Sequence, residues 1–372
     1  MRVLFVINSF TYGGAEKLVF DLARGVARGC DYVGVAALYR ENNDVECRMQ
    51  QRLAEAGVKT YILDKKAGTD KMATVLKLRR ILKCENVSLI HAHCSVPMYL
   101  SKIAGKISGV RVVCTVHSTR GYRPKLEKIT GWMADAYVSI GQAAEEYMAG
   151  SLGIPRDKIV RIYNAVDADT FTPGAVPPGF WKQWGVPEDV PVVVNVGRIV
   201  PSKNQICLLR ALAQCRAHGS NMHCVLLGGY DETSETYLAL RQFVSENAME
   251  DCVHFLGQQD DIQQFLRSSN CFVMTSRFEG LSLSFLEAVL CGIPVITTDM
   301  PFVWELEQIA PCAAVVPQDD ADALSELLLC GNYAPPSKEA MEIFRRTFSL
   351  ERFCQAHLAL YDRCVQGMRR KM

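Results

Sequence analysis

Short apolar runs separated by amphipathic stretches recur along the whole chain. Apolar runs of about four to eight residues are typical of strands buried in a parallel sheet, and longer amphipathic stretches predict helices. In the first half this pattern predicts strands at residues 3–8, 32–38, 60–63, 88–92, 110–116 and 136–140, with helices between them, including 15–25 and 142–152. Because strands and helices alternate, we expect an α/β fold with a doubly wound parallel sheet.

The pattern begins again after a stretch rich in proline. Residues 172–191 contain five prolines, a composition typical of a linker. Beyond it we expect strands at residues 192–196, 225–227, 253–255, 271–274 and 294–297, helices from 204 and over 282–290, and a helical tail over 341–370. A length of 372 residues also suits two domains. We therefore predict an N-terminal domain at 1–170, a hinge at 171–191, a C-terminal domain at 192–352 and a final helix at about 353–372.

Composition narrows the class of protein. Apolar residues make up 49% of the chain, enough for buried cores. The 15 cysteines form no C-x-x-C pair and lie singly in apolar surroundings, which suits reduced thiols in the cytoplasm. The first residues do not resemble a signal peptide, and no apolar window has the length of a membrane-spanning helix. We therefore expect a cytoplasmic protein.

Charge is distributed unevenly, although the net charge is only +1. Residues 1–186 carry 26 Lys and Arg against 17 Asp and Glu, and residues 187–372 carry 15 against 23. The basic half suggests an anionic partner, although an uneven solvated surface is an equally good interpretation. Basic and aromatic residues mix in 120–132, and further basic residues lie in 77–80 and 102–106. This pattern favours an anionic membrane surface, or else a plain surface loop and helix, and we expect no nucleic acid among the partners.

Two glutamates mark the most informative stretch, residues 276–298. Glu279 lies at a loop tip after an apolar run, and Glu287 lies in the predicted helix that follows. Loops at the carboxyl ends of parallel strands line the ligand crevice, and carboxylates there can accept hydrogen bonds from sugar or ribose hydroxyls. Two other interpretations remain open: Glu287 could form a capping box with Ser284, and Glu279 could be a solvated loop residue.

Two strand-to-helix turns could hold phosphate. Gly13 and Gly14 follow the first strand, where bare backbone and helix N–H groups can approach an anion. Arg198 and Lys203 flank the corresponding turn of the second half, so two cations could meet a diphosphate from one side. The dinucleotide fingerprint G-x-G-x-x-G is absent from the first turn, which disfavours an NAD oxidoreductase.

Three histidines end two of the predicted strands. His91 and His93 belong to the L-I-H-A-H run and His117 to the T-V-H-S run. We expect His91 and His93 to point to opposite faces of their strand, and no acidic or cysteine ligand set accompanies them, so we predict no metal site. His117 is the better functional candidate, the alternative being a structural histidine that bonds a neighbouring loop.

Taken together, these motifs closely resemble the family 4 retaining glycosyltransferases, which have the GT-B fold. Residues 279–287 match the family's E-x7-E signature, flanked by E-G-L, E-A and C-G-I-P-V-I. G-G-A-E at 13–16, N-A-V-D at 164–167, G-R-I-V-P-S-K-N at 197–204 and H-F-L-G-Q at 254–258 resemble further family motifs in the family's order. The resemblance implies two Rossmann-like domains that face each other across a cleft, with the last helix returning to the first domain.

The resemblance also implies a reaction and its residues. A sugar would pass with retention from a nucleoside diphosphate sugar, UDP-sugar rather than GDP-sugar, to a carbohydrate or lipid-linked acceptor in surface polysaccharide or glycolipid synthesis. No metal or other cofactor would take part, because the D-x-D at 167–169 falls inside the hinge motif. The implied catalytic residues are Arg198, Lys203, Glu279 and His117. The implied donor-binding residues are Gly13, Gly14, Gly197, Gly257, Gln258, Glu279, Gly280, Leu281, Ser282 and Glu287.

Two departures and two rival functions remain. Asn204 stands where the family has glycine, and residues 300–305 read M-P-F-V-W-E where many members carry a glycine pair before a glutamate. A nucleotide-sugar 2-epimerase could share the fold but needs extra acid/base carboxylates. A non-catalytic nucleotide-binding or regulatory protein is disfavoured because Arg198, Lys203 and Glu279 are all present.

Overall fold

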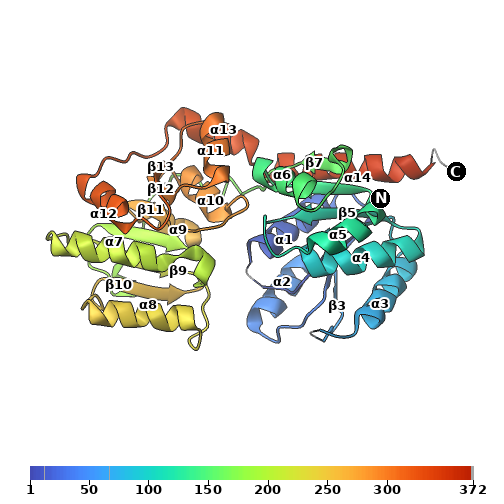
Figure 1. Cartoon of the computed structure of the whole chain (residues 1–372), viewed down its shortest axis with the longest axis horizontal. Helices are drawn as coiled ribbons and strands as arrows, with labels where there is room; N and C mark the ends of the chain where they lie inside the picture. The colour runs from blue at the N-terminus through green and yellow to red at the C-terminus, as the bar shows by residue number, and fades with distance from the viewer. Residues whose placement is uncertain (12, 67, 370–372) are drawn as a thin grey trace. The chain divides into compact units, whose positions relative to one another are not determined.

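The computed structural model describes residues 1–11, 13–66 and 68–369 of the chain. These residues form two compact units (Figure 1). Unit 1 contains Met1–Ala165 and the chain from Phe348 onward, and unit 2 contains Val166–Thr347. Each unit is an α/β fold built on a parallel sheet, so the predicted fold class of two Rossmann-like domains is confirmed.

Unit 1 holds a seven-stranded sheet in the order β3-β2-β1-β4-β5-β6-β7, with every neighbouring pair parallel. The strands are β1 (Arg2–Ile7), β2 (Tyr32–Ala37), β3 (Lys59–Ile62), β4 (Leu89–His93), β5 (Arg111–Val116), β6 (Ala136–Ser139) and β7 (Ile159–Arg161). The chain runs outward from β1 in one direction and from β4 in the other. The carboxyl ends of β1 and β4 therefore flank a topological switch point, where α/β sheets bind ligands.

Seven helices lie on the unit 1 sheet among the described residues: α1 (Gly14–Ala27), α2 (Asp44–Glu55), α3 (Lys71–Cys84), α4 (Ser95–Ser108), α5 (Pro124–Thr130), α6 (Gln142–Gly150) and α14 (Leu350–Arg369). Helix α1 packs against α2 and α14, and α3 packs against α4. Figure 1 shows the red helix α14 lying against the blue and green elements of unit 1. A Cβ on Gly25 would lie 2.3 Å from Sγ of Cys354, so the glycine allows α1 and α14 to approach closely.

Unit 2 repeats the plan with a six-stranded parallel sheet in the order β10-β9-β8-β11-β12-β13. Its strands are β8 (Val192–Val196), β9 (His223–Leu227), β10 (Val253–Gly257), β11 (Cys271–Met274), β12 (Val295–Thr298) and β13 (Ala314–Val316). Its described helices are α7 (Gln205–Ala217), α8 (Glu235–Glu246), α9 (Ile262–Arg267), α10 (Leu283–Cys291), α11 (Pro301–Ile309), α12 (Ala321–Cys330) and α13 (Lys338–Thr347). The switch point lies between β8 and β11, because the chain runs outward from each of them in opposite directions.

The proline-rich segment 171–191 packs onto unit 2. Phe180 and Trp181 are buried and meet Phe265 edge-on, with ring centroids 5.0 and 5.9 Å from it. The indole N–H of Trp181 donates to the carbonyl of Ser268 at 2.7 Å. Buried aromatic side chains of this kind contribute strongly to a core, so the segment is tied to the unit that follows it.

Three elements differ from the sequence-based expectations. Strands β7 and β13 were not predicted, because each is only three residues long. The tail predicted as one helix over 341–370 contains two helices, α13 and α14, of which the described part ends at Arg369. The break follows from Ser349, whose hydroxyl accepts from the N–H of Arg352 and so starts a new helix at Leu350.

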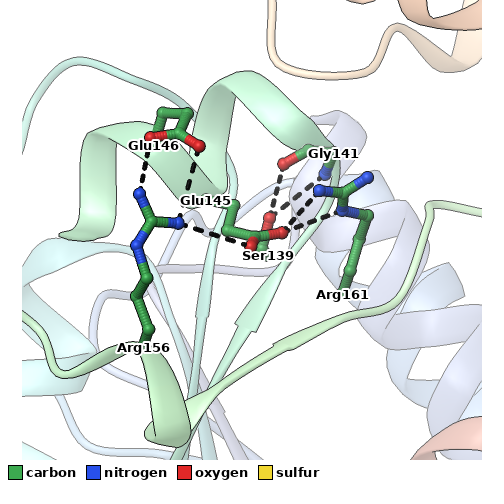
Figure 2. A network of polar contacts seen from close by, with 6 residues as sticks. All are labelled: Ser139, Gly141, Glu145, Glu146, Arg156 and Arg161. Carbon is green, nitrogen blue, oxygen red and sulfur yellow. Dashed lines mark hydrogen bonds and ion pairs between the residues drawn. The ribbon is translucent and has the colours of Figure 1, made fainter. Parts of the chain in front are cut away.

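A polar network fixes the loop between β6 and α6 at the carboxyl edge of the unit 1 sheet (Figure 2). The hydroxyl of Ser139 donates to the carbonyl of Gly141, just before α6. Arg161, at the end of β7, bonds Glu145 at 2.7 Å. Partly exposed ion pairs of this kind contribute only about 0–1 kcal/mol each, so the network mainly sets local geometry.

Charge follows the two units more closely than it follows the two halves of the sequence. Unit 1 carries 30 Lys and Arg against 17 Asp and Glu, whereas unit 2 carries 11 against 23. The difference is sharper than in the halves because the basic C-terminal segment belongs to unit 1. Among the described residues, no helix combines the length and the apolar character that crossing a membrane requires.

Candidate functional site

Two predicted catalytic residues meet at the switch point of unit 2. Lys203 lies in the short turn Pro201–Lys203 after β8, and Glu279 lies in the loop after β11. Nζ of Lys203 contacts Oε1 of Glu279, and the hydroxyl of Ser276 donates to the same oxygen at 2.8 Å. Both side chains are partly exposed, at 22% and 15%, so a ligand can reach them. Glu279 is therefore fixed by two partners, and its interpretation as a solvated loop residue is wrong.

Arg198 lies on the same strand-to-helix turn as Lys203. Its side chain is exposed, and within the described part of the chain no hydrogen bond or ion pair holds its guanidinium. Its backbone, in contrast, is fixed: its carbonyl accepts from the side-chain amide of Gln205 at 3.1 Å, and the neighbouring Ile199 N–H donates to Gly229 at 3.1 Å. A planar guanidinium on a fixed backbone is well suited to bind phosphate oxygens in pairs.

Three glycine-containing loops converge beside these cations. A Cβ on Gly197 would lie 3.2 Å from Cε of Lys203, so the lysine stem passes over bare backbone. Gly228, which the sequence analysis did not single out, has φ of +139°, and a Cβ there would lie 2.3 Å from the carbonyl oxygen of Gly197. Its N–H donates to the carbonyl of Gly257 at 2.7 Å. The glycine pair directly after the apolar run 225–227 was the signal in the sequence that could have identified it.

Asn204 departs from the family's glycine but adopts the conformation that glycine favours. Its φ and ψ are 53° and 39°, in the left-handed region, where Asn is the side chain best tolerated after Gly. Its side-chain amide donates to Asp319 at 2.9 Å, and the Thr275 hydroxyl donates to its carbonyl at 3.0 Å. The departure therefore keeps the shape of the loop.

Helix α10 carries Glu287 into the interior of unit 2. The helix begins at Leu283, and its N-cap is Ser282, whose hydroxyl accepts from the N–H of Phe285 at 3.4 Å. Ser284 therefore lies inside the first turn, and the capping-box interpretation of Glu287 is wrong. Glu287 is only 5% exposed. Gly280 and Leu281 lie in the loop between Glu279 and this N-cap.

The switch point of unit 1 lies beside Gly13 and Cys94. Gly13 is the N-cap of α1, and a Cβ there would lie 2.1 Å from Oε2 of Glu16, so a side chain at this position would require the Glu16 carboxylate to move. Gly14 is the first residue of α1. Cys94 follows β4 with φ of 70° and ψ of 160°, a conformation that is costly for a residue with a side chain. Such backbone strain is typical of functional loops.

The histidines at this edge form one cluster, which corrects the expectation that His91 and His93 point to opposite faces. Successive residues alternate along a strand, so residues two apart share a face, and the two rings lie with centroids 4.1 Å apart. Nδ1 of His93 lies 2.9 Å from Nε2 of His117. His91 bonds the hydroxyls of Tyr361 at 2.6 Å and Thr115 at 2.7 Å. The cluster thus links β4 and β5 to α14.

Burial keeps the cluster neutral. Desolvation lowers the pKa of His117 and of His357, a further member on α14, to about 4. It lowers the pKa of His91 and His93 well below the usual range. Neutral rings both donate and accept hydrogen bonds, so these histidines can orient polar ligands without adding charge.

The D-x-D at 167–169 forms a turn. Oδ1 of Asp167 accepts from the N–H of Asp169 at 3.1 Å, and Oδ2 accepts from the hydroxyl of Thr170 at 2.8 Å. These bonds occupy the carboxylate locally. Over residues 1–11, 13–66 and 68–369, no group of three or more His, Cys, Asp and Glu side chains has an arrangement that could hold a metal ion.

Comparison with known proteins identifies the class of protein. Residues 12–170 match the family model described as Glycosyltransferase Family 4, and residues 180–329 match the model described as Glycosyl transferases group 1. Together the two models cover most of the chain. The protein is therefore a glycosyltransferase of the GT-B type.

Individual relatives are more distant. The chain is 26% identical, over 80% of its length and 79% of the relative's, to the Bacillus subtilis protein described as "Putative glycosyltransferase EpsF". It is 25% identical, over 62% of both chains, to the Escherichia coli UDP-Gal:α-D-GlcNAc-diphosphoundecaprenol α-1,3-galactosyltransferase. The crystal structure of Anabaena HepE in complex with UDP and glucose is similar in fold, with a TM-score of 0.83 and 21% identity, over 97% of this chain and 99% of that one.

Proposed function

We propose that the protein is a retaining glycosyltransferase of family 4 that transfers a sugar from a nucleoside diphosphate sugar, with UDP-sugars as the preferred donors, to an acceptor hydroxyl. The observation that carries the proposal is the joint placement of Arg198, Lys203 and Glu279 at the switch point of unit 2. Two cations and a carboxylate there match the two parts of such a donor, an anionic diphosphate and a polar sugar.

Each residue has a distinct role in this proposal. Arg198 and Lys203 stabilise the negative charge that builds up on the departing diphosphate, which is commonly the largest catalytic contribution. Glu279 orients the donor sugar, and Glu287 accepts hydrogen bonds from the ribose hydroxyls. Gly197, Gly257 and the N–H groups of Gly280, Leu281 and Ser282 let the donor approach the backbone, and Gln258 lies beside the base. In unit 1, Gly13 and Gly14 contact phosphate and His117 contacts the sugar.

The proton of the acceptor hydroxyl has no side-chain base in this scheme. The leaving diphosphate takes that proton on the same face of the sugar as the acceptor attacks, which gives retention. No metal is required, because Arg198 and Lys203 supply the positive charge that a divalent ion would otherwise provide. Support for a UDP-sugar donor comes from similar proteins, since the Escherichia coli relative uses UDP-Gal and the HepE structure contains UDP.

A thermal-shift screen across nucleotide sugars, followed by product analysis, tests this function. A donor at 100 times its dissociation constant should stabilise the protein by about 2.7 kcal/mol. A glycoside formed only when acceptor is present supports transfer. Conversion of the nucleotide sugar without acceptor would indicate an epimerase, and binding without any product would indicate a regulatory nucleotide-binding protein.

We also propose a lipid-linked acceptor, reached by unit 1 on an anionic membrane surface. Lys102 must be removed from the predicted surface, because it is fully buried and its Nζ lies 2.7 Å from Oε2 of Glu127. Ile129 and Trp132, in contrast, are 68% and 58% exposed, and Nζ of Lys106 lies 4.6 Å from the centroid of the Trp132 ring. Exposed apolar and basic side chains on neighbouring turns suit the boundary between headgroups and acyl chains.

Co-sedimentation with vesicles tests the membrane proposal. Each basic residue near an anionic surface contributes about 1 kcal/mol, so reversing four should abolish binding to anionic vesicles. The substituted residues are Arg120, Arg123, Lys125 and Lys128, each changed to Glu. A matched control reverses four exposed arginines in or directly after α1 and α2, namely Arg24, Arg28, Arg48 and Arg52. Equal loss in both variants would indicate a general charge effect, and equal binding to neutral and anionic vesicles would refute the proposal.

A further inference from the structure

Two stacked histidines lie at the carboxyl edge of the unit 1 sheet. His93 ends β4 and His117 directly follows β5, and their ring centroids are 5.2 Å apart. Nδ1 of His93 and Nε2 of His117 are 2.9 Å apart, a normal hydrogen-bond distance. In a neutral imidazole one nitrogen donates and the other accepts, so this bond can form in two ways. The two ways leave His117 with different chemistry at its other nitrogen.

The surroundings of His93 select one of the two directions of this hydrogen bond. Nε2 of His93 is buried, and no described residue forms a hydrogen bond with it. If His93 accepted at Nδ1, its proton would sit on Nε2 and leave a buried N–H without an acceptor. If His93 donates from Nδ1, Nε2 keeps an unused lone pair instead. Orphaned buried N–H groups are rarer than under-used acceptors, so His93 donates to Nε2 of His117.

The direction of this hydrogen bond determines the tautomer of His117. Desolvation lowers the pKa of His117 to about 4 and that of His93 well below the usual range, so both rings are neutral at physiological pH. A neutral His117 that accepts at Nε2 carries its proton on Nδ1. The two nitrogens of an imidazole point in nearly opposite directions, so this N–H points away from His93. His117 is partly exposed, which leaves the N–H accessible to a ligand.

We propose that His93 is a positioning residue that fixes His117 as an Nδ1–H donor to an oxygen of the transferred sugar. The inference rests on the proposed function, which assigns the sugar contact to His117. It adds a direction to that contact: His117 donates to a hydroxyl or ring oxygen and does not accept from it. A histidine in the other tautomer would repel the same lone pair.

Neighbouring groups hold the pair in this arrangement. His91 packs on His93 at 4.1 Å and is itself held by hydroxyls, which donate or accept as needed and so impose no tautomer. The centroid of the Phe5 ring lies 6.2 Å from the centroid of the His93 ring. The backbone N–H of His117 donates to the hydroxyl of Tyr122 at 3.0 Å, which fixes the backbone of His117. Ring rotation that would break the His93–His117 bond is therefore restricted.

Two substitutions at His93 separate positioning from packing. His93→Asn keeps an N–H donor near the position of Nδ1, whereas His93→Leu removes it. We expect His93→Leu to lower kcat/KM for the donor sugar by about tenfold, the scale of one lost hydrogen bond, and His93→Asn to recover most of it. A matched control exists in unit 2, where Nδ1 of His223 lies 3.0 Å from Nε2 of His254 at the opposite, amino-terminal end of the strands. His223→Leu should leave the kinetics unchanged.

Long-range ¹H–¹⁵N NMR of histidine rings gives a readout that does not depend on activity. With the signals of His117 assigned through His117→Gln, the wild type should show a protonated Nδ1 and an unprotonated Nε2 at neutral pH. His93→Leu should shift this balance toward the Nε2–H form, and His93→Asn should preserve it. Circular dichroism checks that each variant is folded.

Three results would overturn the inference: a protonated Nε2 of His117 in the wild type, full activity in folded His93→Leu, or equal impairment in folded His93→Asn and His93→Leu. If His93→Leu does not fold, the tautomer of His117 measured by NMR in the wild type still tests the inference. Failure of the proposed function is distinguishable, because it would show as an absence of transfer from any nucleotide sugar while the NMR spectrum still reports the tautomer of His117.

Discussion

The neutral histidine cluster makes the stability of unit 1 depend on pH in a defined window. His357 is the clearest member, since it is 1% exposed and its Nδ1–H donates to the carbonyl of Phe353 at 2.8 Å. Burial lowers its pKa from 6.5 to about 4. In the unfolded chain the ring binds a proton near pH 6.5, whereas in the folded chain it does so only near pH 4. Acidification through this window therefore favours the unfolded state.

The magnitude follows from the pKa difference. One pKa unit corresponds to about 1.4 kcal/mol, so at about pH 5 each such histidine lowers the free energy of unfolding by about 2 kcal/mol relative to about pH 7.5. His117 has the same pKa of about 4 and contributes in the same direction. Stability should be constant above about pH 7.5 and fall progressively below it. Carboxylates with lowered pKa values, such as Asp64 and Glu85, contribute only at more acidic pH.

Hydrogen exchange of the β4 and β5 amides measures this opening free energy for unit 1 alone. After correction for intrinsic exchange rates, it should fall between about pH 7 and pH 5, and His357→Leu should reduce the slope by at most about 1.4 kcal/mol per pH unit, the limit for one proton. The control His218→Gln changes an exposed histidine of unit 2 and should leave that slope unchanged. A flat profile over this window, or an unchanged slope in His357→Leu, would refute the assignment of a buried neutral cluster.

Three further expectations concern unit 2. Arg198→Ala and Lys203→Ala should each lower kcat by about 10²-fold or more, the scale for losing one charge-stabilising donor, and wild-type turnover in both would contradict their role. Transfer should persist in EDTA, since the proposed scheme supplies positive charge from side chains; loss of activity that Mn²⁺ or Mg²⁺ restores would contradict this. Asn204→Ala should destabilise unit 2 by about 1–2 kcal/mol in chemical denaturation because alanine disfavours the left-handed conformation, whereas Asn204→Gly should not; equal effects would show that conformation is not the cause.

The sequence identified long strands and the loops between them well, because both signals are local. Strands such as β8 and β11 are uninterrupted apolar runs, and their predicted bounds match the structure. Short edge strands gave no such signal, since β7 and β13 take their extended conformation from pairing with a neighbour. The break before α14 was missed because a serine cap is a weaker sequence signal for a helix boundary than proline or glycine.

Contacts between distant segments could not be derived from the sequence. The proximity of Lys203 and Glu279 depends on β8 and β11 being neighbours, although 76 residues separate the two side chains. The contact of His91 with Tyr361 spans 270 residues and requires the last helix to pack on unit 1. Lys102 was assigned to the surface because a basic residue in an amphipathic helix is usually exposed, and only the fold brings Glu127 beside it.

The charge of each unit bears on the proposed division of labour between them. Unit 2 is acidic overall, with 11 Lys and Arg against 23 Asp and Glu, yet it is the unit proposed to bind an anionic diphosphate. Screening resolves this apparent conflict, because exposed charges more than about 8 Å away have little effect at physiological ionic strength. Binding is then governed by the nearest groups, Arg198 and Lys203. The basic excess of unit 1 would act differently in the proposed membrane contact, since a membrane is an extended anion that many surface charges meet at once. Local cations thus suit the donor, and distributed charge suits a lipid-linked acceptor.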